Sequence, residues 1–310
     1  MMRGLRRIPF SILAFSLLIQ ACHAWAETRV GVLYPDSAPA IARLYQGIVE
    51  GMSRAGDVRL RSRAVSDKDS AEEVRAWLLA GQSQVAIVLG DLPAALTGSL
   101  ATTMPVIYGA SALNDNGLAG VSLSSSPARM FARLRQLKPD ADRVFVVFRP
   151  QATGWLIAAA RTAAREQGLE LTAVACDDVQ QATAAISAFL QQVRPGKDAV
   201  WLTLDPVVPL NQLLPVLLRE SWERRLVLFS NNPVDVAKGA LFALYPDYPA
   251  MGRQLAERAR RQLSKSPVTG PEASEHLNGA LNTRTAAHLG ITLTEQERQS
   301  FSRQFPETPE

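Results

Sequence analysis

A polar residue or a glycine follows almost every short apolar run in this chain, at the point where a strand would end. In open α/β sheets a small molecule binds beyond the carboxyl ends of the strands, so side chains at these points can hydrogen-bond it. Asp, Asn and Ser also cap helices and form turns, so each position alone has a purely structural explanation. The candidate ligand-binding residues are Tyr34, Asp36, Gly90, Asp91, Gly109, Ser111, Arg149, Gln151, Asp205, Ser230 and Asn231.

The sequence holds little that predicts catalysis or metal binding. No G-x-S-x-G nucleophile elbow, no G-x-x-x-x-G-K-[ST] phosphate loop and no G-x-G-x-x-G after a strand is present. Carboxylates occur as sequence neighbours, such as Glu72 with Glu73, and adjacent side chains point apart. The histidines, His23, His276 and His288, show no metal-ligand spacing with one another or with Cys176. We therefore expect that the protein is not an enzyme and that it has no cofactor and no metal site. The enzymatic alternative is a hydrolase or isomerase on a Rossmann-like sheet.

The first 26 residues are typical of a secretory signal. Arg3, Arg6 and Arg7 precede an apolar run at 8–19 that is shorter than the about 20 residues a membrane-spanning helix needs. Ala-Trp-Ala at 24–26 fits the small-x-small cleavage pattern, which predicts a mature chain beginning at Glu27 in the periplasm.

A lipoprotein is the alternative form of export. Ile-Gln-Ala-Cys at 19–22 loosely resembles the lipobox of bacterial lipoproteins, in which the cysteine, here Cys22, is lipidated after cleavage. Gln20 departs from the small residue that is usual there. In either form Cys176 has no clear disulfide partner, so the fold must depend on its core.

The charge of the chain argues against nucleic acid as a partner. The sequence has 33 basic and 29 acidic residues and an isoelectric point of about 9.3. Three of the basic residues and none of the acidic ones lie in the leader, which leaves 30 against 29. No basic stretch interleaved with aromatic residues stands out, so we expect no nucleic-acid partner.

Apolar strands alternate with helical periodicity, which predicts parallel sheets covered by helices on both faces. The alternation restarts after a turn-rich break at 114–126, so we expect an α/β protein of two doubly wound, Rossmann-like lobes with a hinge and a ligand cleft between them; one large sheet is the alternative. The predicted strands lie at 29–34, 58–65, 85–89, 105–108, 143–148, 171–176, 199–204 and 226–229.

An apolar stripe predicts that the chain returns to the first lobe after Leu244. Met251, Leu255, Ala259 and Leu263 recur at helical spacing and need a sheet face to cover. The expected division is a signal at 1–26, a first lobe of 27–124 plus about 245–290, a second lobe of 125–244, and a C-terminal tail at 291–310.

Several short motifs stand out from residue 143 onward. They are Lys-Gly-Ala-Leu at 238–241, Asp-Tyr at 247–248, Gly-Arg-Gln at 252–254, Leu-Asn at 281–282, Leu-Gly-Ile at 289–291, the strand at 143–148 and Asp205. These motifs resemble those of the substrate-binding proteins of ABC transporters with the type I periplasmic-binding fold, in the group related to tryptophan- and tyrosine-binding lipoproteins. The resemblance spans nearly the whole mature chain.

The resemblance implies a protein whose two lobes close on a small polar or amphipathic molecule, and an amino-acid-like ligand is the class that this family suggests. It also implies that Asp205 contacts the ligand and that the partner is an ABC permease; a membrane receptor or kinase that reads the closed form is the alternative. Three departures leave the ligand open. Arg149 stands where family members commonly carry Asn, Pro206 follows Asp205 in place of Asn, and Pro249 replaces a second Tyr.

Overall fold

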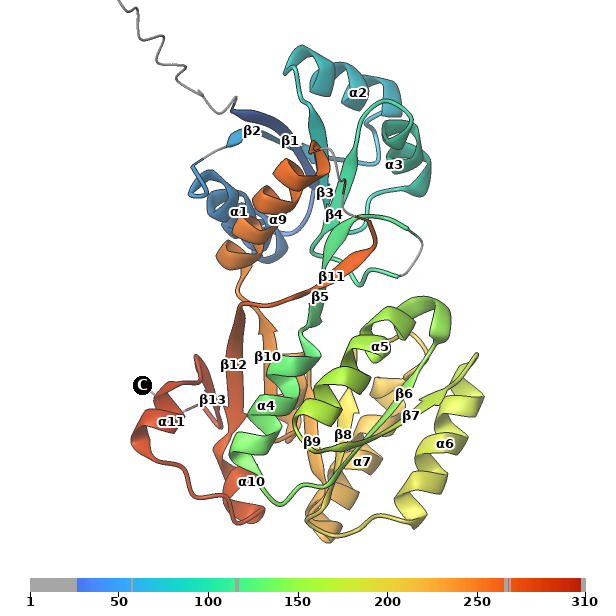
Figure 1. Cartoon of the computed structure of the whole chain (residues 1–310), viewed down its shortest axis with the longest axis vertical. Coiled ribbons are helices and arrows are strands. Elements are labelled where there is room, and N and C mark those ends of the chain that lie inside the picture. The colour runs from blue at the N-terminus through green and yellow to red at the C-terminus, as the bar shows by residue number, and fades with distance from the viewer. Residues whose placement is uncertain (1–26, 57, 115–116, 265–266, 268, 308–310) are drawn as a thin grey trace, which may run out of the picture.

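The computed structural model describes residues 27–307 except 57, 115, 116, 265, 266 and 268. The predicted signal at 1–26, with its cleavage site and Cys22, therefore lies outside the described residues. Within the described part of the chain, no helix is both long and apolar enough to cross a membrane. The chain forms two lobes, one above the other in Figure 1, each built on its own sheet.

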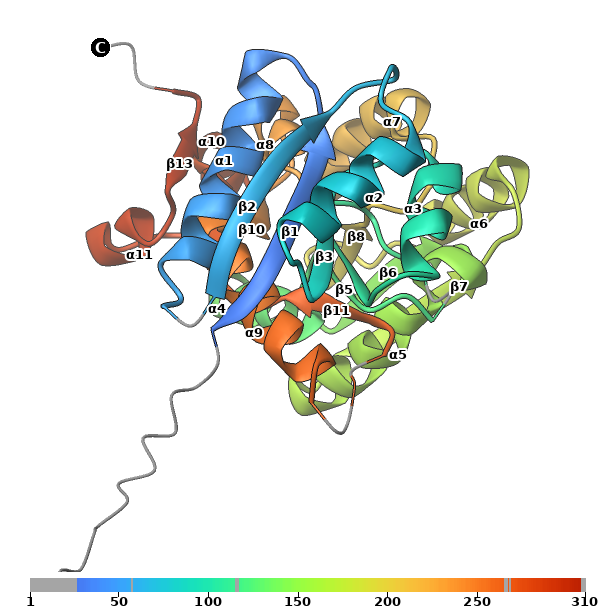
Figure 2. The same ribbon diagram turned by 90° about the horizontal axis from the view of Figure 1, so that it is seen from above.

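The first lobe is a six-stranded, all-parallel sheet in the order β11-β5-β4-β3-β1-β2. Its central strand β3 is fully buried, and alternate side chains supply two separate apolar cores, one under each layer of helices. Figure 2 shows α1 on one side of this sheet and α2 and α3 on the other. The elements are β1 (Thr28–Pro35), α1 (Pro39–Ser53), β2 (Val58–Val65), α2 (Ala71–Ala80), β3 (Val85–Leu89), α3 (Ala94–Ala101), β4 (Val106–Gly109), β5 (Gly120–Ser125), α9 (Tyr248–Gln262) and β11 (Pro271–Ser274).

Helix α9 returns to the first lobe, as its apolar stripe predicts. Met251, Leu255 and Ala259 are buried in the same core as α1. Leu263, the last residue of the predicted stripe, is exposed because the helix ends before it. Helices α1 and α9 approach closely because each has a glycine where they touch. A Cβ on Gly252 of α9 would lie 2.0 Å from the Ile48 carbonyl oxygen of α1. This close approach gives a physical reason for the glycine in the Gly-Arg-Gln motif.

The second lobe is a seven-stranded sheet in the order β13-β12-β10-β9-β8-β6-β7. Its pairs are parallel except β10 with β12. The core on one face centres on Trp201, which lies against Phe131 and Phe229. The elements are α4 (Pro127–Leu137), β6 (Arg143–Phe148), α5 (Pro150–Glu166), β7 (Glu170–Ala175), α6 (Val179–Gln191), β8 (Asp198–Leu202), α7 (Leu210–Arg224), β9 (Val227–Ser230), α8 (Pro233–Lys238), β10 (Phe242–Pro246), β12 (Leu277–Asn282), α10 (Thr283–His288), α11 (Glu295–Gln299) and β13 (Arg303–Phe305).

A buried ion cluster joins β6 to β8 at their amino ends. The Asp198 side chain is 0% exposed and accepts hydrogen bonds from Arg143 (2.6 and 3.1 Å) and from the backbone and side chain of Arg194 (2.8 and 3.0 Å). Burial alone would raise the pKa of Asp198, but these hydrogen bonds outweigh it and hold the pKa below its ordinary value. The cluster stabilises the second lobe far from the hinge.

The lobe boundaries differ from the expected ones at the C-terminal end. Residues 277–290, expected in the first lobe, form β12 and α10 of the second, because β12 pairs antiparallel with β10. The expected tail is part of the fold: β13 pairs with β12, and Phe301 and Phe305 are buried. The predicted class of two doubly wound α/β lobes is confirmed, in place of the single large sheet.

The chain crosses between the lobes three times, after β5, after β10 and after β11. Side-chain and backbone hydrogen bonds of serines join the crossing segments to one another. The Ser125 hydroxyl donates to the Leu244 carbonyl (2.7 Å), and the Ser126 amide donates to the Ser274 carbonyl (2.9 Å). The crossing after β5 lies at the C-terminal end of the break predicted at 114–126. These segments form the hinge.

Candidate functional site

The carboxyl ends of the parallel strands in both lobes lie on the hinge side. Strand β5 runs parallel to β4 and leaves the first lobe at its carboxyl end, and β10 runs parallel to β9 and leaves the second lobe in the same way. The loops after β1, β3 and β4 therefore lie toward the loops after β6, β8 and β9 (Figure 1). The two lobes also touch directly, since the Trp155 indole N–H on α5 donates to the Leu113 carbonyl (2.9 Å) in the loop after β4.

In the first lobe two tyrosines stack beside the loop after β3. The rings of Tyr34 and Tyr45 lie 5.6 Å apart at 28°. Gly90 has a φ of +68°, and a Cβ there would lie 2.2 Å from the Tyr45 hydroxyl oxygen, so this position needs glycine. Burial, and to a lesser extent the carboxylate of Asp91, raises the pKa of Tyr45. Asp36 and Asp91 are exposed at the ends of their strands.

The loop after β4 is tightly built. A Cβ on Gly109 would lie 2.7 Å from a methyl of Leu255, so this glycine serves the packing of α9. Ala110 adopts a left-handed φ of 54°, which is uncommon without a glycine and is found more often at functional sites. Ser111 is buried, and its carbonyl accepts from the Leu123 amide (3.0 Å).

In the second lobe Asp205 is bound to its own surroundings. It is 5% exposed and accepts hydrogen bonds from the Arg149 amide (2.9 Å), the Val207 amide (2.8 Å) and the Thr153 hydroxyl. It thus joins the loop after β8 to the first turn of α5. It does not cap α7, whose N-cap is Pro209. A carboxylate has about four acceptor positions, so one remains for a ligand.

Ser230 and Asn231 are also engaged within the lobe, but not completely. The Ser230 hydroxyl donates to Asp235 (2.5 Å), and burial, partly offset by this bond, raises the pKa of that carboxyl. The Asn231 side-chain oxygen accepts from the Trp201 indole N–H (2.9 Å).

Three buried polar atoms near these loops have no hydrogen-bond partner among the described residues. They are Arg149 Nε, Thr203 Oγ1 and Asn231 Nδ2. Thr203 and Asn231 are 1% and 3% exposed and directly follow the paired strands β8 and β9. A buried polar group without a partner costs about 1–3 kcal/mol, so these atoms are suited to bind a ligand that would satisfy them.

Four helices that follow interior strands begin without a side-chain cap. These are α1, α3, α5 and α7, with N-caps Ala38, Pro93, Arg149 and Pro209. The helices α2, α6, α8 and α9, in contrast, are capped by the side chains of Ser70, Asp178, Asn232 and Asp247. Free backbone N–H groups and the positive end of the helix dipole favour negatively charged or acceptor groups, such as a carboxylate.

The structure therefore brings the predicted residues to two facing edges, and it adds others. Gln151 is exposed in the first turn of α5. Tyr45 is not among the predicted site residues, and Thr203 lies inside the strand predicted at 199–204, which ends at Leu202 in the structure. Because β8 ends at Leu202, Thr203 is the first residue of the loop after this strand and so lies at the edge of the sheet that carries the candidate site. No group of three His, Cys, Asp or Glu side chains that could hold a metal ion occurs in the part of the chain that is described.

No family model matches the chain, and no curated protein matches it by sequence. Solved structures do match over most of its length. A conserved domain protein from Vibrio cholerae O1 biovar eltor is 17% identical with a TM-score of 0.52, over 90% of this chain and 99% of that one. An ABC domain from Streptococcus pneumonia in complex with L-Trp is 16% identical with a TM-score of 0.53, over 90% and 100%. The ligand-free, open structure of CD0873, a substrate-binding protein with adhesive properties from Clostridium difficile, is 15% identical with a TM-score of 0.57, over 89% and 98%.

These likenesses show the fold, which is the two-lobed fold of periplasmic binding proteins. Two of the three structures are described as binding a ligand or substrate, and none as an enzyme.

Proposed function

We propose that this protein is an extracytoplasmic solute-binding protein that captures a small molecule between its lobes and delivers it to an ABC permease. The observation that carries the proposal is the set of buried, unpartnered polar atoms of Thr203, Asn231 and Arg149 at the carboxyl ends of the second-lobe strands. The facing first-lobe loops, with the Tyr34 and Tyr45 rings, supply the opposite wall. This arrangement supports binding and release of a small molecule.

The mechanism is capture by lobe closure. A ligand that touches both lobes only when they are closed binds that state more tightly and so shifts the population toward it. The Trp155 to Leu113 hydrogen bond is one contact through which the two lobes already meet. The permease would then distinguish the closed form from the open one.

The ligand we propose is a small molecule with a carboxylate, such as an amino acid. The uncapped starts of α5 and α7 present backbone N–H groups on the side where Asn231 Nδ2 offers a further donor. Asp205, with one remaining acceptor position, would receive a hydrogen bond from an amine. The solved ABC domain in complex with L-Trp agrees with this ligand class.

Thr203→Val tests the site because the change is nearly isosteric. Its hydroxyl has no partner among the described residues, so its loss should not lower the free energy of unfolding. A library of amino acids and other small metabolites is screened by thermal shift, and each hit is measured by calorimetry. The variant should bind about 2- to 10-fold more weakly, as expected for one hydrogen bond.

Thr172→Val is the matched control, on edge strand β7 away from this site. It should leave the affinity unchanged. A hit whose affinity is the same in Thr203→Val, Asn231→Ala and the native protein would contradict the proposed site. Export is tested separately: N-terminal sequencing of the secreted protein should give Glu27, whereas a lipidated Cys22 would replace the periplasmic form by a membrane-anchored one.

A further inference from the structure

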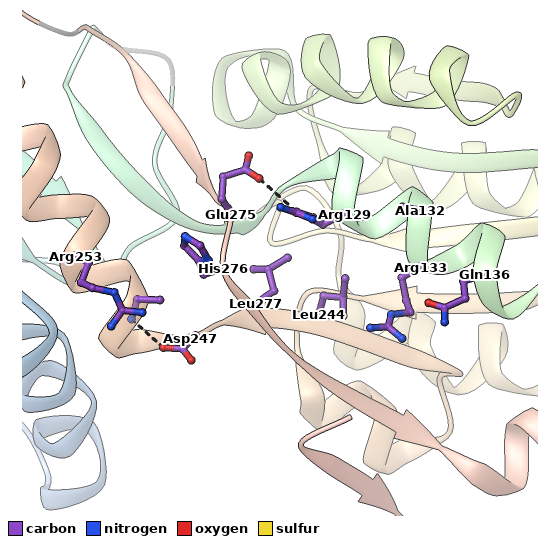
Figure 3. Close-up of a pocket in the computed structure, with 11 residues that line it drawn as sticks. Arg129, Ala132, Arg133, Gln136, Leu244, Asp247, Arg253, Glu275, His276 and Leu277 are labelled. Carbon is purple, nitrogen blue, oxygen red and sulfur yellow. Dashed lines mark hydrogen bonds and ion pairs between the residues drawn. The ribbon is translucent and has the colours of Figure 1, made fainter. Parts of the chain in front are cut away.

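A cavity lies beside the hinge, and residues of both lobes line it. Its volume is about 530 Å³. Helix α4 of the second lobe forms one wall, the start of α9 of the first lobe forms the other, and the connection from β11 to β12 lies between them (Figure 3). This cavity is separate from the loops that carry Thr203 and Asn231, none of which lines it.

Arginines enter the cavity from opposite lobes. Figure 3 shows Arg253 of α9 on one side and Arg133 of α4 on the other, with His276 and Leu277 between them. Arg253 is exposed, and within the described ranges its side chain has no hydrogen bond or ion pair. One guanidinium from the first lobe is thus without a counter-charge.

The Arg133 guanidinium makes no direct ion pair with a carboxylate among the residues that the structure describes. It donates to the neutral Ser300 hydroxyl (3.0 Å) and lies 4.6 Å from the centre of the Phe301 ring. Burial lowers its pKa, and the charge of the Glu297 carboxylate only partly opposes this. An anion in the cavity would add a direct ion pair that Glu297 does not form.

The carboxylates that line the cavity are already engaged. Asp247 accepts from the Ala250 amide (2.8 Å) as the N-cap of α9. Glu275 lies 3.8 Å from Arg129, and both side chains are more than half exposed. Exposed pairs of this kind contribute about 0–1 kcal/mol, so a better acceptor can replace Glu275 as the partner of Arg129.

We propose that this hinge cavity is a binding site for a small polyanion, such as a di- or tricarboxylate or a phosphate ester, that bridges Arg253 of the first lobe and Arg133 of the second. The site goes beyond the proposed function, because it is distinct from the site for the transported molecule. Guanidinium groups bind carboxylate and phosphate oxygens through paired, charge-assisted hydrogen bonds. The volume is within the about 300–1,000 Å³ typical of small-molecule sites.

Binding at the hinge couples to lobe movement. An anion that contacts both guanidinium groups binds most tightly at the interlobe arrangement where both reach it, and so shifts the population toward that arrangement. By thermodynamic reciprocity, it changes the affinity of the interlobe ligand by the same factor by which that ligand changes the affinity of the anion.

Calorimetry with citrate and with inorganic phosphate as probes tests the site. We expect Arg253→Gln to weaken binding about 10- to 100-fold, as for the loss of a charge-assisted hydrogen bond, without loss of thermal stability, because this side chain has no partner to lose. Arg133→Lys keeps the charge but not the paired hydrogen bonds, and should weaken binding by a smaller factor. A preference for citrate indicates a polycarboxylate and a preference for phosphate indicates a phosphate ester.

Arg161→Gln, an exposed arginine of α5 outside the cavity, is the matched control and should bind both probes as the native protein does. The proposal is overturned if neither probe binds, or if Arg253→Gln and Arg161→Gln bind equally well. Small-angle scattering with and without the better probe tests the coupling: an unchanged interlobe distance distribution would refute it. These outcomes do not depend on whether an interlobe ligand is found, so failure here and failure of the proposed function are distinguishable.

Discussion

Removing the carboxylate of Asp205 should destabilise the second lobe at the hinge side. In Asp205→Ala the amides of Arg149 and Val207 and the hydroxyl of Thr153 lose their shared acceptor. Each lost hydrogen bond that leaves a donor unpaired costs about 1–3 kcal/mol. Val207 is buried and Arg149 is half-buried, so water can replace little of the loss, and the low end of this range is the minimum for each bond.

The minimum total is therefore about 3 kcal/mol. For a chain of this size 1 kcal/mol corresponds to about 2–4 °C in melting temperature, which gives a decrease of roughly 6–12 °C. Thr153→Val removes one of the three hydrogen bonds and keeps the β-branched shape, so it should cost about 1 kcal/mol. In a double-mutant cycle the two changes should be less than additive, because both remove the same bond.

Thermal unfolding followed by circular dichroism measures the stability, and calorimetry with an identified ligand measures the affinity. A melting temperature of Asp205→Ala within 2 °C of the native value, roughly 1 kcal/mol or less, would refute the structural role. The ligand contact predicted from the sequence is a separate claim. It requires that Asp205→Ala bind about 10- to 100-fold more weakly, and an unchanged affinity would refute it.

Three further changes test other parts of the structure. Trp155→Phe removes the indole donor to the Leu113 carbonyl, so it should shift the lobe equilibrium about 2- to 10-fold, seen by small-angle scattering, with the melting temperature nearly unchanged. Gly252→Ala should lower the melting temperature by more than 5 °C, because its Cβ meets the Ile48 carbonyl oxygen; a small effect would contradict the close helix approach. The pKa of Asp198 is lowered in the folded state, so its contribution to stability is complete above the ordinary pKa of 3.8 and is lost as the pH falls below it. Asp198→Asn should therefore be less stable at neutral pH and show a flatter acid unfolding profile by circular dichroism.

The sequence by itself determined the strands whose burial is local and continuous. The apolar runs of β3, β6 and β9 can only be interior, and their alternation with helices determines parallel pairing. The same reasoning identifies the residues after each strand, since the carboxyl ends of parallel strands share one edge. The fold class and the region of the candidate site can therefore be predicted from short segments of the sequence, each considered by itself.

The tertiary structure alone decided how the hinge is built and which side chains surround it. Strands β5, β10, β11, β12 and β13 were not predicted. In β5 and β12 the serines, glycines and asparagines look like loop residues until β4 and β10 pair with them. The engagement of Asp205 by Thr153 likewise depends on two strands becoming neighbours. The hinge cavity needs Arg133 and Arg253, which only the crossing of the chain between lobes brings together. The local pattern of apolar residues predicts which segments are buried. The contacts of the folded chain decide which distant segments pair with one another.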